Sequence, residues 1–226
     1  MMAIVNSFFN FSYRNSVEKE VNKIHVAQIS SMDCGTACLL MVFNWSMRPH
    51  VLLDHLPQPC WTIDLYVFLR TFGFDATLYT LVDGINPENL SLVWYSANMN
   101  SSADISRCND QFALARREGW EINKEISIAQ IAQRVARNDT IAICLVDTNF
   151  LKKRNSGFAG HYVVLLHYEA STRAFWYLDP AQDATVKIMS KLDLDDARTR
   201  PGTDNDIIFI KNVTENTAEH LVVPGN

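Results

Sequence analysis

The sequence predicts one α+β domain, in which an N-terminal helical part packs on a C-terminal antiparallel sheet. Apolar residues in the first half recur at helical spacing, whereas β-branched and aromatic runs separated by turn-like clusters fill most of the second half. Helices that precede strands, rather than alternate with them, are typical of the α+β class. A chain of 226 residues is also long enough to bury one stable core without disulfide or zinc staples.

The helical half begins after a short extended run at 24–27. Cys34 to Trp45 follows as a helix that is too apolar to lie on a surface, so we expect it to be central. A second helix begins at Thr62, whose hydroxyl is expected to cap the first turn, while Asp64 favours the positive end of the helix dipole. Gly73 is expected to end this helix.

The later elements are shorter and mostly strands. Ser127 and Gln130 form a capping box that opens a third outer helix. Residues 1–23 show no periodicity and are predicted to form an N-terminal arm, which leaves 24–212 as the domain and 213–226 as a C-terminal tail. The other predicted elements are the strands 75–81, 140–146, 162–168, 175–178 and 206–211 and the helices 103–118 and 190–198.

Composition and charge exclude several classes of protein. With 48% hydrophobic and 20% charged residues, the chain is neither disordered nor collagen-like. The 20 Lys and Arg against 25 Asp and Glu give a net charge of −5 without a long basic run, which argues against a nucleic-acid partner. No segment approaches the ~18 unbroken apolar residues of a membrane span, and the first residues lack the leading positive charge of a signal peptide. Five scattered cysteines indicate free thiols, so a cytoplasmic protein is expected; its oligomeric state stays open.

Cys34 has the most distinctive chemical setting, because a loop from Gln28 delivers it to the first position of the buried helix. A thiol at a helix N-terminus, next to an imidazolium, is expected to ionise well below the pKa of about 8.5 of a free thiol. Gly35 is expected to leave room for a substrate carbonyl, and the Gln28 amide and the Cys34 N–H would donate to a developing oxyanion. Asp33 opposes thiolate formation unless its carboxylate turns away to cap the helix.

A cysteine nucleophile needs an imidazole and a group that orients the imidazole. His161 opens a predicted strand directly after Gly160, the last residue of a flexible approach that is also expected to border the substrate. Asp179 ends the next aromatic strand. If the two strands form a hairpin, the Asp179 carboxylate reaches one ring nitrogen of His161 while the other nitrogen faces Cys34.

Each of these residues also has a structural explanation, since a buried cysteine is usually a small hydrophobic residue and an aspartate before proline commonly forms a turn. Their combination in this order favours a thiol site. Trp61 and Trp176 are candidate walls of a substrate groove, although large aromatics are first of all core residues. His50, His55 and Cys60 are spaced loosely enough for zinc, but they lack a fourth ligand nearby, so a surface loop is favoured and no cofactor is expected.

These motifs resemble those of known families. The runs 28–34, 160–164 and 179–181 are similar to the papain-like cysteine peptidase superfamily, especially the leader-peptidase domains that process bacteriocins. With the runs 60–65 and 202–208, they resemble the guanylyl cyclase domain-containing family, also called plant guanylyl cyclases. The likeness covers most of the chain and implies a papain-like fold with a thiol site made of Gln28, Cys34, His161 and Asp179.

Three functions remain open at this point. The residues favour a papain-like thiol hydrolase, in which Cys34 attacks a peptide, isopeptide or amide bond of a peptide or small acyl substrate. The family name implies instead conversion of GTP to cyclic GMP with Mg²⁺ or Mn²⁺. Against it, the eight glycines form no phosphate-binding loop, and the acidic cluster at 193–196 is more simply the capped start of a helix. The third function is a non-catalytic binding module that keeps the triad as structure.

Overall fold

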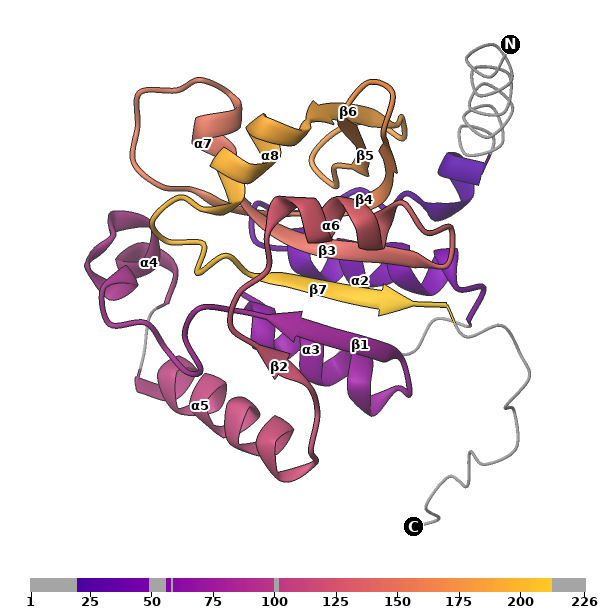
Figure 1. The fold of residues 1–226 in the computed structure, drawn as a ribbon. Helices are drawn as coiled ribbons and strands as arrows, with labels where there is room; N and C mark the ends of the chain where they lie inside the picture. Colours follow the sequence, from indigo (N-terminus) through magenta and orange to yellow (C-terminus); the bar gives the residue numbers. More distant parts are fainter. Residues whose placement is uncertain (1–19, 49–55, 58, 100–101, 213–226) are drawn as a thin grey trace, which may run out of the picture.

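The computed structural model describes residues 20–48, 56–57, 59–99 and 102–212. Its centre is a seven-stranded sheet with the strand order β2-β1-β7-β3-β4-β5-β6, and helices cover both faces (Figure 1). The helices are α2 (Cys34–Trp45), α3 (Thr62–Thr71), the 3-10 turn η1 (Asn89–Ser91), α4 (Val93–Asn98), α5 (Ser102–Arg117), α6 (Ile128–Val135), α7 (Thr148–Leu151) and α8 (Lys191–Arg198). The strands are β1 (Asp75–Tyr79), β2 (Ile122–Asn123), β3 (Thr140–Asp147), β4 (Gly160–Glu169), β5 (Ala174–Leu178), β6 (Lys187–Ser190) and β7 (Ile207–Lys211).

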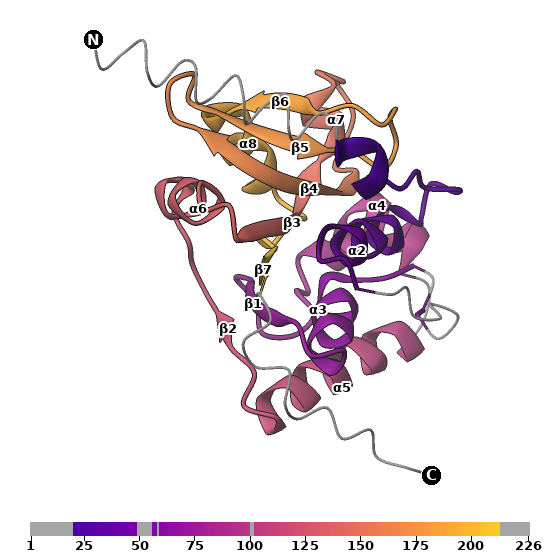
Figure 2. The same ribbon diagram turned by 90° about the vertical axis from the view of Figure 1, so that its right-hand side faces the viewer.

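Alternate residues of the central strands belong to two separate hydrophobic cores. In β3, Ile141, Ile143 and Leu145 join the core shared with α2 and α3, whereas the residues between them join the core shared with α6 and α8. This follows from the period of two along a strand, which sends successive side chains to opposite faces. Figure 2 shows the result, with α2 and α3 on one side of the sheet and α6 on the other.

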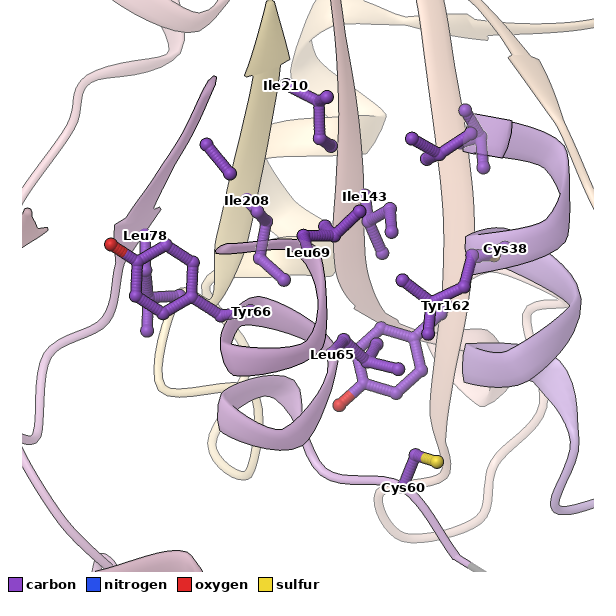
Figure 3. Close-up of a cluster of buried hydrophobic side chains, with 14 of the residues drawn as sticks. Cys38, Cys60, Leu65, Tyr66, Leu69, Leu78, Ile143, Tyr162, Ile208 and Ile210 are labelled. Carbon is purple, nitrogen blue, oxygen red and sulfur yellow. The ribbon is translucent and has the colours of Figure 1, made fainter. Parts of the chain in front are cut away.

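The α2 and α3 core is the one that positions the candidate site. Figure 3 shows Cys38 of α2 and Leu65 and Leu69 of α3 gathered against Ile143 and Tyr162 of the sheet. Four of these five side chains are at most 1% exposed, and Tyr162 is 5% exposed. Close packing of this kind resists small displacements, so it holds the start of α2 at a fixed place relative to β4.

The α+β prediction is confirmed, and α2 begins and ends at the predicted residues. One detail differs, because β1 comes from the helical half and yet lies inside the sheet, paired in parallel with β2 and antiparallel with β7. The sheet is therefore neither confined to the C-terminal half nor wholly antiparallel. Ala76 and Leu78 are both at most 1% exposed, so burial of their side chains holds β1 in this interior position.

The segment before α2 is held by the loop that follows β5. Of the predicted extended run 24–27, Ile24 belongs to a helical turn, and 25–27 belong to no helix or strand. Instead, the His25 ring nitrogen Nε2 is hydrogen-bonded to the Asp179 carbonyl at 3.1 Å, and the Gln28 N–H donates to the Pro180 carbonyl at 2.9 Å. These two bonds join the loop that carries Cys34 to the loop that carries Asp179, so they help to bring the two together.

The predicted N-terminal arm is partly integrated in the fold. Residues 20–24 form a helical turn, and Val21 is 1% exposed in the α2 and α3 core. The rest of the predicted arm, 1–19, and the predicted tail, 213–226, lie outside the described residues. Within the part of the chain that is described, no helix combines the length and the apolar character needed to cross a membrane.

Candidate active site

Cys34 is the first residue of α2 and is 8% exposed. The loop before it is closed by Ser30, whose N–H and hydroxyl both donate to the Asp33 carboxylate, at 2.9 and 2.7 Å. Asp33 is the N-cap residue but makes no side-chain bond to the helix. Its carboxylate is thus held in the loop rather than over the first turn, which leaves the positive end of the α2 dipole next to Cys34.

His161 and Asp179 come together at the open end of the β4–β5 hairpin. His161 is the second residue of β4, and Asp179 directly follows β5. The two strands pair antiparallel with Val164 opposite Leu178, as the sequence predicted. The His161 nitrogen Nε2 lies 2.7 Å from the Asp179 oxygen Oδ1, and both residues are buried. Nδ1 is then the ring nitrogen left for another partner.

The Cys34 side chain lies close enough to the same ring to contribute to the pKa of His161. Burial alone would lower the pKa of His161, but the Asp179 hydrogen bond and the interaction with Cys34 outweigh it and raise this pKa to about 9. The ring is therefore a cation at neutral pH. The structure thus brings Cys34, His161 and Asp179 together in the order that the sequence predicted.

The Asp179 carboxylate is stabilised as an anion by several donors. Burial raises the pKa of Asp179, but His161 opposes this, with further bonds from the Ala181 N–H at 2.9 Å and the Gln182 amide at 2.5 Å. The net result is a pKa of about 2. Asp179 therefore remains charged across the physiological range, and it can hold the His161 ring in one orientation while the ring gains or loses a proton.

Gln28, the predicted oxyanion donor, is held by bonds to two neighbouring loop carbonyls. Its side-chain amide donates to the Ser30 carbonyl at 2.7 Å, and its backbone is bound to Pro180. Its oxygen Oε1 is enclosed and has no hydrogen-bond partner among the described residues. The amide group carries two hydrogens and the Ser30 carbonyl takes one, so the other is left for an oxyanion. The role of Gln28 as an oxyanion donor remains a prediction.

A cavity adjoins Cys34 and encloses about 70 Å³. Trp61 and Gly160 line it, in the place that the prediction of a substrate groove requires, whereas Gly35 does not. A Cβ atom at Gly35 would lie 3.2 Å from Leu65, so this glycine allows close packing of α2 rather than space for a substrate. Trp176 is also away from the cavity, packed against another ring of the sheet.

Sequence analysis missed several residues of this cavity. Trp94 and Tyr95 of α4 form part of its wall, and Asp204 and Asp206, in the turn before β7, line it as well. Asp204 and Asp206 lie in the run 202–208, which carried the family resemblance but had no role assigned to it. Trp94 and Tyr95 lie in no run that was singled out. Residues that lie far apart in the chain reach the cavity through the fold, and no local pattern reports that.

Trp61 is fixed in the cavity wall by the start of α3. The Asp64 carboxylate accepts the Trp61 N–H at 2.9 Å and pairs with Arg107 at 3.2 Å. Thr62 does not cap the helix, in contrast to the prediction, because it is the first helical residue and its hydroxyl is bound to the Tyr162 hydroxyl at 2.8 Å. This bond joins α3 to β4 directly beside His161.

Comparison with known proteins identifies the family. A sequence profile of the family described as guanylylate cyclase matches residues 24–210. The chain belongs to this family. Guanylyl cyclase 1 of Arabidopsis thaliana is 33% identical to it over 205 residues, which cover 82% of this chain and 74% of the relative. The resemblance predicted from the motifs is confirmed.

A weaker similarity exists among solved structures. The crystal structure of a putative C39-like peptidase from Bacillus anthracis is 16% identical, with a TM-score of 0.29. The similarity covers 39% of this chain and 49% of that one, so the chain spans about half the length of this solved neighbour.

Nucleotide cyclases commonly use metal ions, so groups of side chains that could bind one are relevant to this family. Among the residues described here, no group of at least three His, Cys, Asp or Glu side chains is arranged to hold a metal ion. His50 and His55, weighed above as zinc ligands, lie outside the described residues. The acidic helix start is capped as predicted, since Ser190 accepts the Asp193 N–H at 3.1 Å. All five cysteines are free thiols.

Proposed function

We propose that this member of the guanylylate cyclase family is a thiol hydrolase, in which Cys34 attacks the acyl carbon of a peptide, isopeptide or amide bond. The observation that carries the proposal is the continuous set of contacts from Cys34 through the His161 ring to the Asp179 carboxylate, next to a cavity. A nucleophile, its base and a group that orients the base form the minimal arrangement for covalent acyl transfer.

The proposed reaction has two steps. The Cys34 sulfur attacks the acyl carbon, the bond to the amine breaks, and the His161 cation gives its proton to the leaving amine. The neutral ring then takes a proton from water, whose oxygen attacks the thioester, so that the acid leaves and the Cys34 thiolate and the His161 cation are restored. Asp179 holds the ring throughout. The Cys34 N–H and the Gln28 amide are the proposed donors to the oxyanion of each step.

The reactivity of the thiol can be measured with iodoacetamide at pH 6. A free thiol with a pKa near 8.5 is only about 0.3% ionised at this pH, so a thiol paired with an imidazolium should react at least about tenfold faster. Cys60 provides an internal control, since it is 5% exposed and lines the same cavity. Burial raises the pKa of Cys60 to about 12, so it should react slowly. Mass spectrometry of the labelled peptides gives both rates.

Two variants make this experiment decisive. His161→Gln should lower the Cys34 rate to near that of Cys60, because the cation that stabilises the thiolate is lost. Asp183→Asn removes an exposed carboxylate outside the triad and should leave the Cys34 rate unchanged. If Cys34 reacts no faster than Cys60, or equally fast without His161, the hydrolase proposal is wrong.

Acyl transfer can be separated from simple thiol reactivity with p-nitrophenyl acetate. Attack by Cys34 should release one equivalent of p-nitrophenolate in a burst and leave an acetyl group on the Cys34 peptide, followed by slower hydrolysis. Asp179→Asn should reduce the burst rate, because the ring is no longer held and charged. An acetyl group that appears on other residues instead, with no burst, would count against the proposed mechanism.

The second candidate is guanylyl cyclase activity, which the family description and the name of the Arabidopsis relative favour. The test is production of cyclic GMP from GTP with Mg²⁺ or Mn²⁺, with Cys34→Ala as a companion. Equal cyclic GMP formation by both proteins would establish a cyclase that does not use the thiol. No product above a heat-denatured sample would remove this candidate.

A further inference from the structure

The cavity beside Cys34 combines apolar walls with one unusual polar group. Among its described lining residues, Trp61, Trp94 and Tyr95 supply aromatic surface, and none is Lys, Arg or His. Two carboxylates, Asp204 and Asp206, line it as well. A narrow, mostly apolar hollow with few polar groups next to a nucleophile is the usual form of a site that selects a substrate side chain.

The two carboxylates differ in their partners. Asp204 accepts hydrogen bonds from the side-chain amides of Asn86 and Asn89, at 2.6 and 2.8 Å, so each of its oxygens has a donor. Asp206 is partly buried, and its oxygen Oδ1 is enclosed by protein without a hydrogen-bond partner in the described part of the chain. A buried acceptor without a donor costs free energy unless a ligand supplies one.

The surroundings of Asp206 favour a cationic donor. Burial and the neighbouring Asp204 raise the pKa of Asp206 to about 7, although the Thr62 and Thr80 hydroxyls lower it. Of the residues that the structure describes, no cationic side chain is among the groups that shift the pKa of Asp206, and Arg107 of α5 is paired with Asp64 and Asp104. A positive charge brought by a ligand would restore the anionic form of Asp206, and the aromatic walls would add cation–π attraction.

We infer that this cavity is a specificity subsite, which receives a lysine-like aminoalkyl side chain of the substrate and pairs its ammonium with Asp206. The mostly apolar lining of the cavity suits the alkyl part of such a side chain, and Asp206 suits its ammonium. The inference rests on the proposed hydrolase function, since it names the substrate class of that same site. It makes the substrate a basic peptide or amide.

The test compares two alkylating probes that differ only in the ammonium group. The chloromethyl ketones of N-acetyl-lysine and N-acetyl-norleucine both form a carbon–sulfur bond with Cys34 and release chloride. The lysine probe should label Cys34 at least about tenfold faster than the norleucine probe. In Asp206→Asn this ratio should fall to about one. In Asp75→Asn, which alters an exposed carboxylate on the far strand β1, the ratio should persist.

A second measurement does not need a reactive thiol. In Cys34→Ala, n-butylammonium should shift the NMR signals of the Trp61 and Trp94 indoles, and n-butanol at the same concentration should shift them at least about tenfold less. Adding Asp206→Asn to this variant should abolish the difference between the two ligands. Equal shifts with n-butylammonium and n-butanol, together with equal labelling rates for the lysine and norleucine ketones, would overturn the inference. If Cys34 still reacts fast with iodoacetamide, the hydrolase proposal stands. If Cys34 reacts slowly with iodoacetamide but the cavity still prefers the ammonium ligand, the hydrolase proposal is wrong, and the cavity binds cations without an active thiol beside it.

Discussion

The contact between His161 and Asp179 makes a quantitative prediction about stability and pH. His161 is 8% exposed, and its pKa rises from 6.5 to about 9 in the folded protein. A histidine whose pKa is higher in the folded state stabilises the fold fully below its unfolded pKa, and this contribution is lost as the pH rises through the folded pKa. At about 1.4 kcal/mol per pKa unit, the free energy of unfolding should fall by about 3 kcal/mol between pH 6.5 and 9.

The perturbation is Asp179→Asn, which keeps the shape of the side chain and removes its charge. Burial then acts on His161 with less opposition, so the pKa of the ring should fall and most of the pH-dependent loss should disappear. Urea unfolding at pH 6.5, 7.5 and 9 measures the slope, and NMR of the His161 ring measures its titration directly. Asp183→Asn is the matched control and should follow the wild-type curve.

The same pair of curves in a Cys34→Ser background removes the contribution of the thiol. Other groups that titrate in this range affect the wild type and the variant alike, so the difference between their curves reports on the His161–Asp179 pair. Parallel curves for wild type and Asp179→Asn, or a His161 ring that titrates near 6.5 in the wild type, would refute the reasoning.

Further predictions concern the cavity and the turn beside it. Asp206 has a raised pKa of about 7, so the protonated carboxyl stabilises the fold at low pH, and this stabilisation is lost as the pH rises from about 4 to 7. Asp206→Asn should therefore be more stable than wild type at pH 8, by about 4 kcal/mol at most, as measured by urea unfolding. An unchanged midpoint would show that Asp206 is solvated. Gly202 has a φ of +103°, and a Cβ there would lie 2.7 Å from a phenyl ring, so Gly202→Ala should cost about 3 kcal/mol or more. Gly119 has a φ of +65° but open space around it, so Gly119→Ala should cost only about 1 kcal/mol, and equal losses in thermal unfolding would contradict the role of crowding.

The predictable parts of this protein are those that local chemistry decides. The apolar run from Cys34 to Trp45 specified a buried helix, and its observed ends are the predicted ones. The β4–β5 hairpin followed from two aromatic and β-branched runs joined by a turn, and it placed Asp179 next to His161. The order of the motifs grouped Cys34, His161 and Asp179, and the structure places them together because each lies at the end of a well-signalled element.

Other features depended on tertiary contacts that no local pattern reports. Thr62 is a residue type that often caps helices, but its hydroxyl is hydrogen-bonded to Tyr162, 100 residues further along the chain. The Asp64 carboxylate accepts the Trp61 N–H at the start of the helix instead. The partner of the Thr62 hydroxyl is thus set by the fold and not by neighbouring residues, so the sequence alone leaves it open.

Strand β4 explains why the triad and the proposed subsite occur together. His161 and Tyr162 are consecutive in β4, so their side chains leave the strand in opposite directions. Tyr162 belongs to the α2 and α3 core and lines the cavity, whereas His161 reaches Cys34 and Asp179. Because Tyr162 is bound to Thr62, one rigid strand fixes both the base and one wall of the cavity. A substrate side chain held in the cavity would therefore be positioned relative to the same strand that positions His161, as the proposed acyl transfer at Cys34 would require.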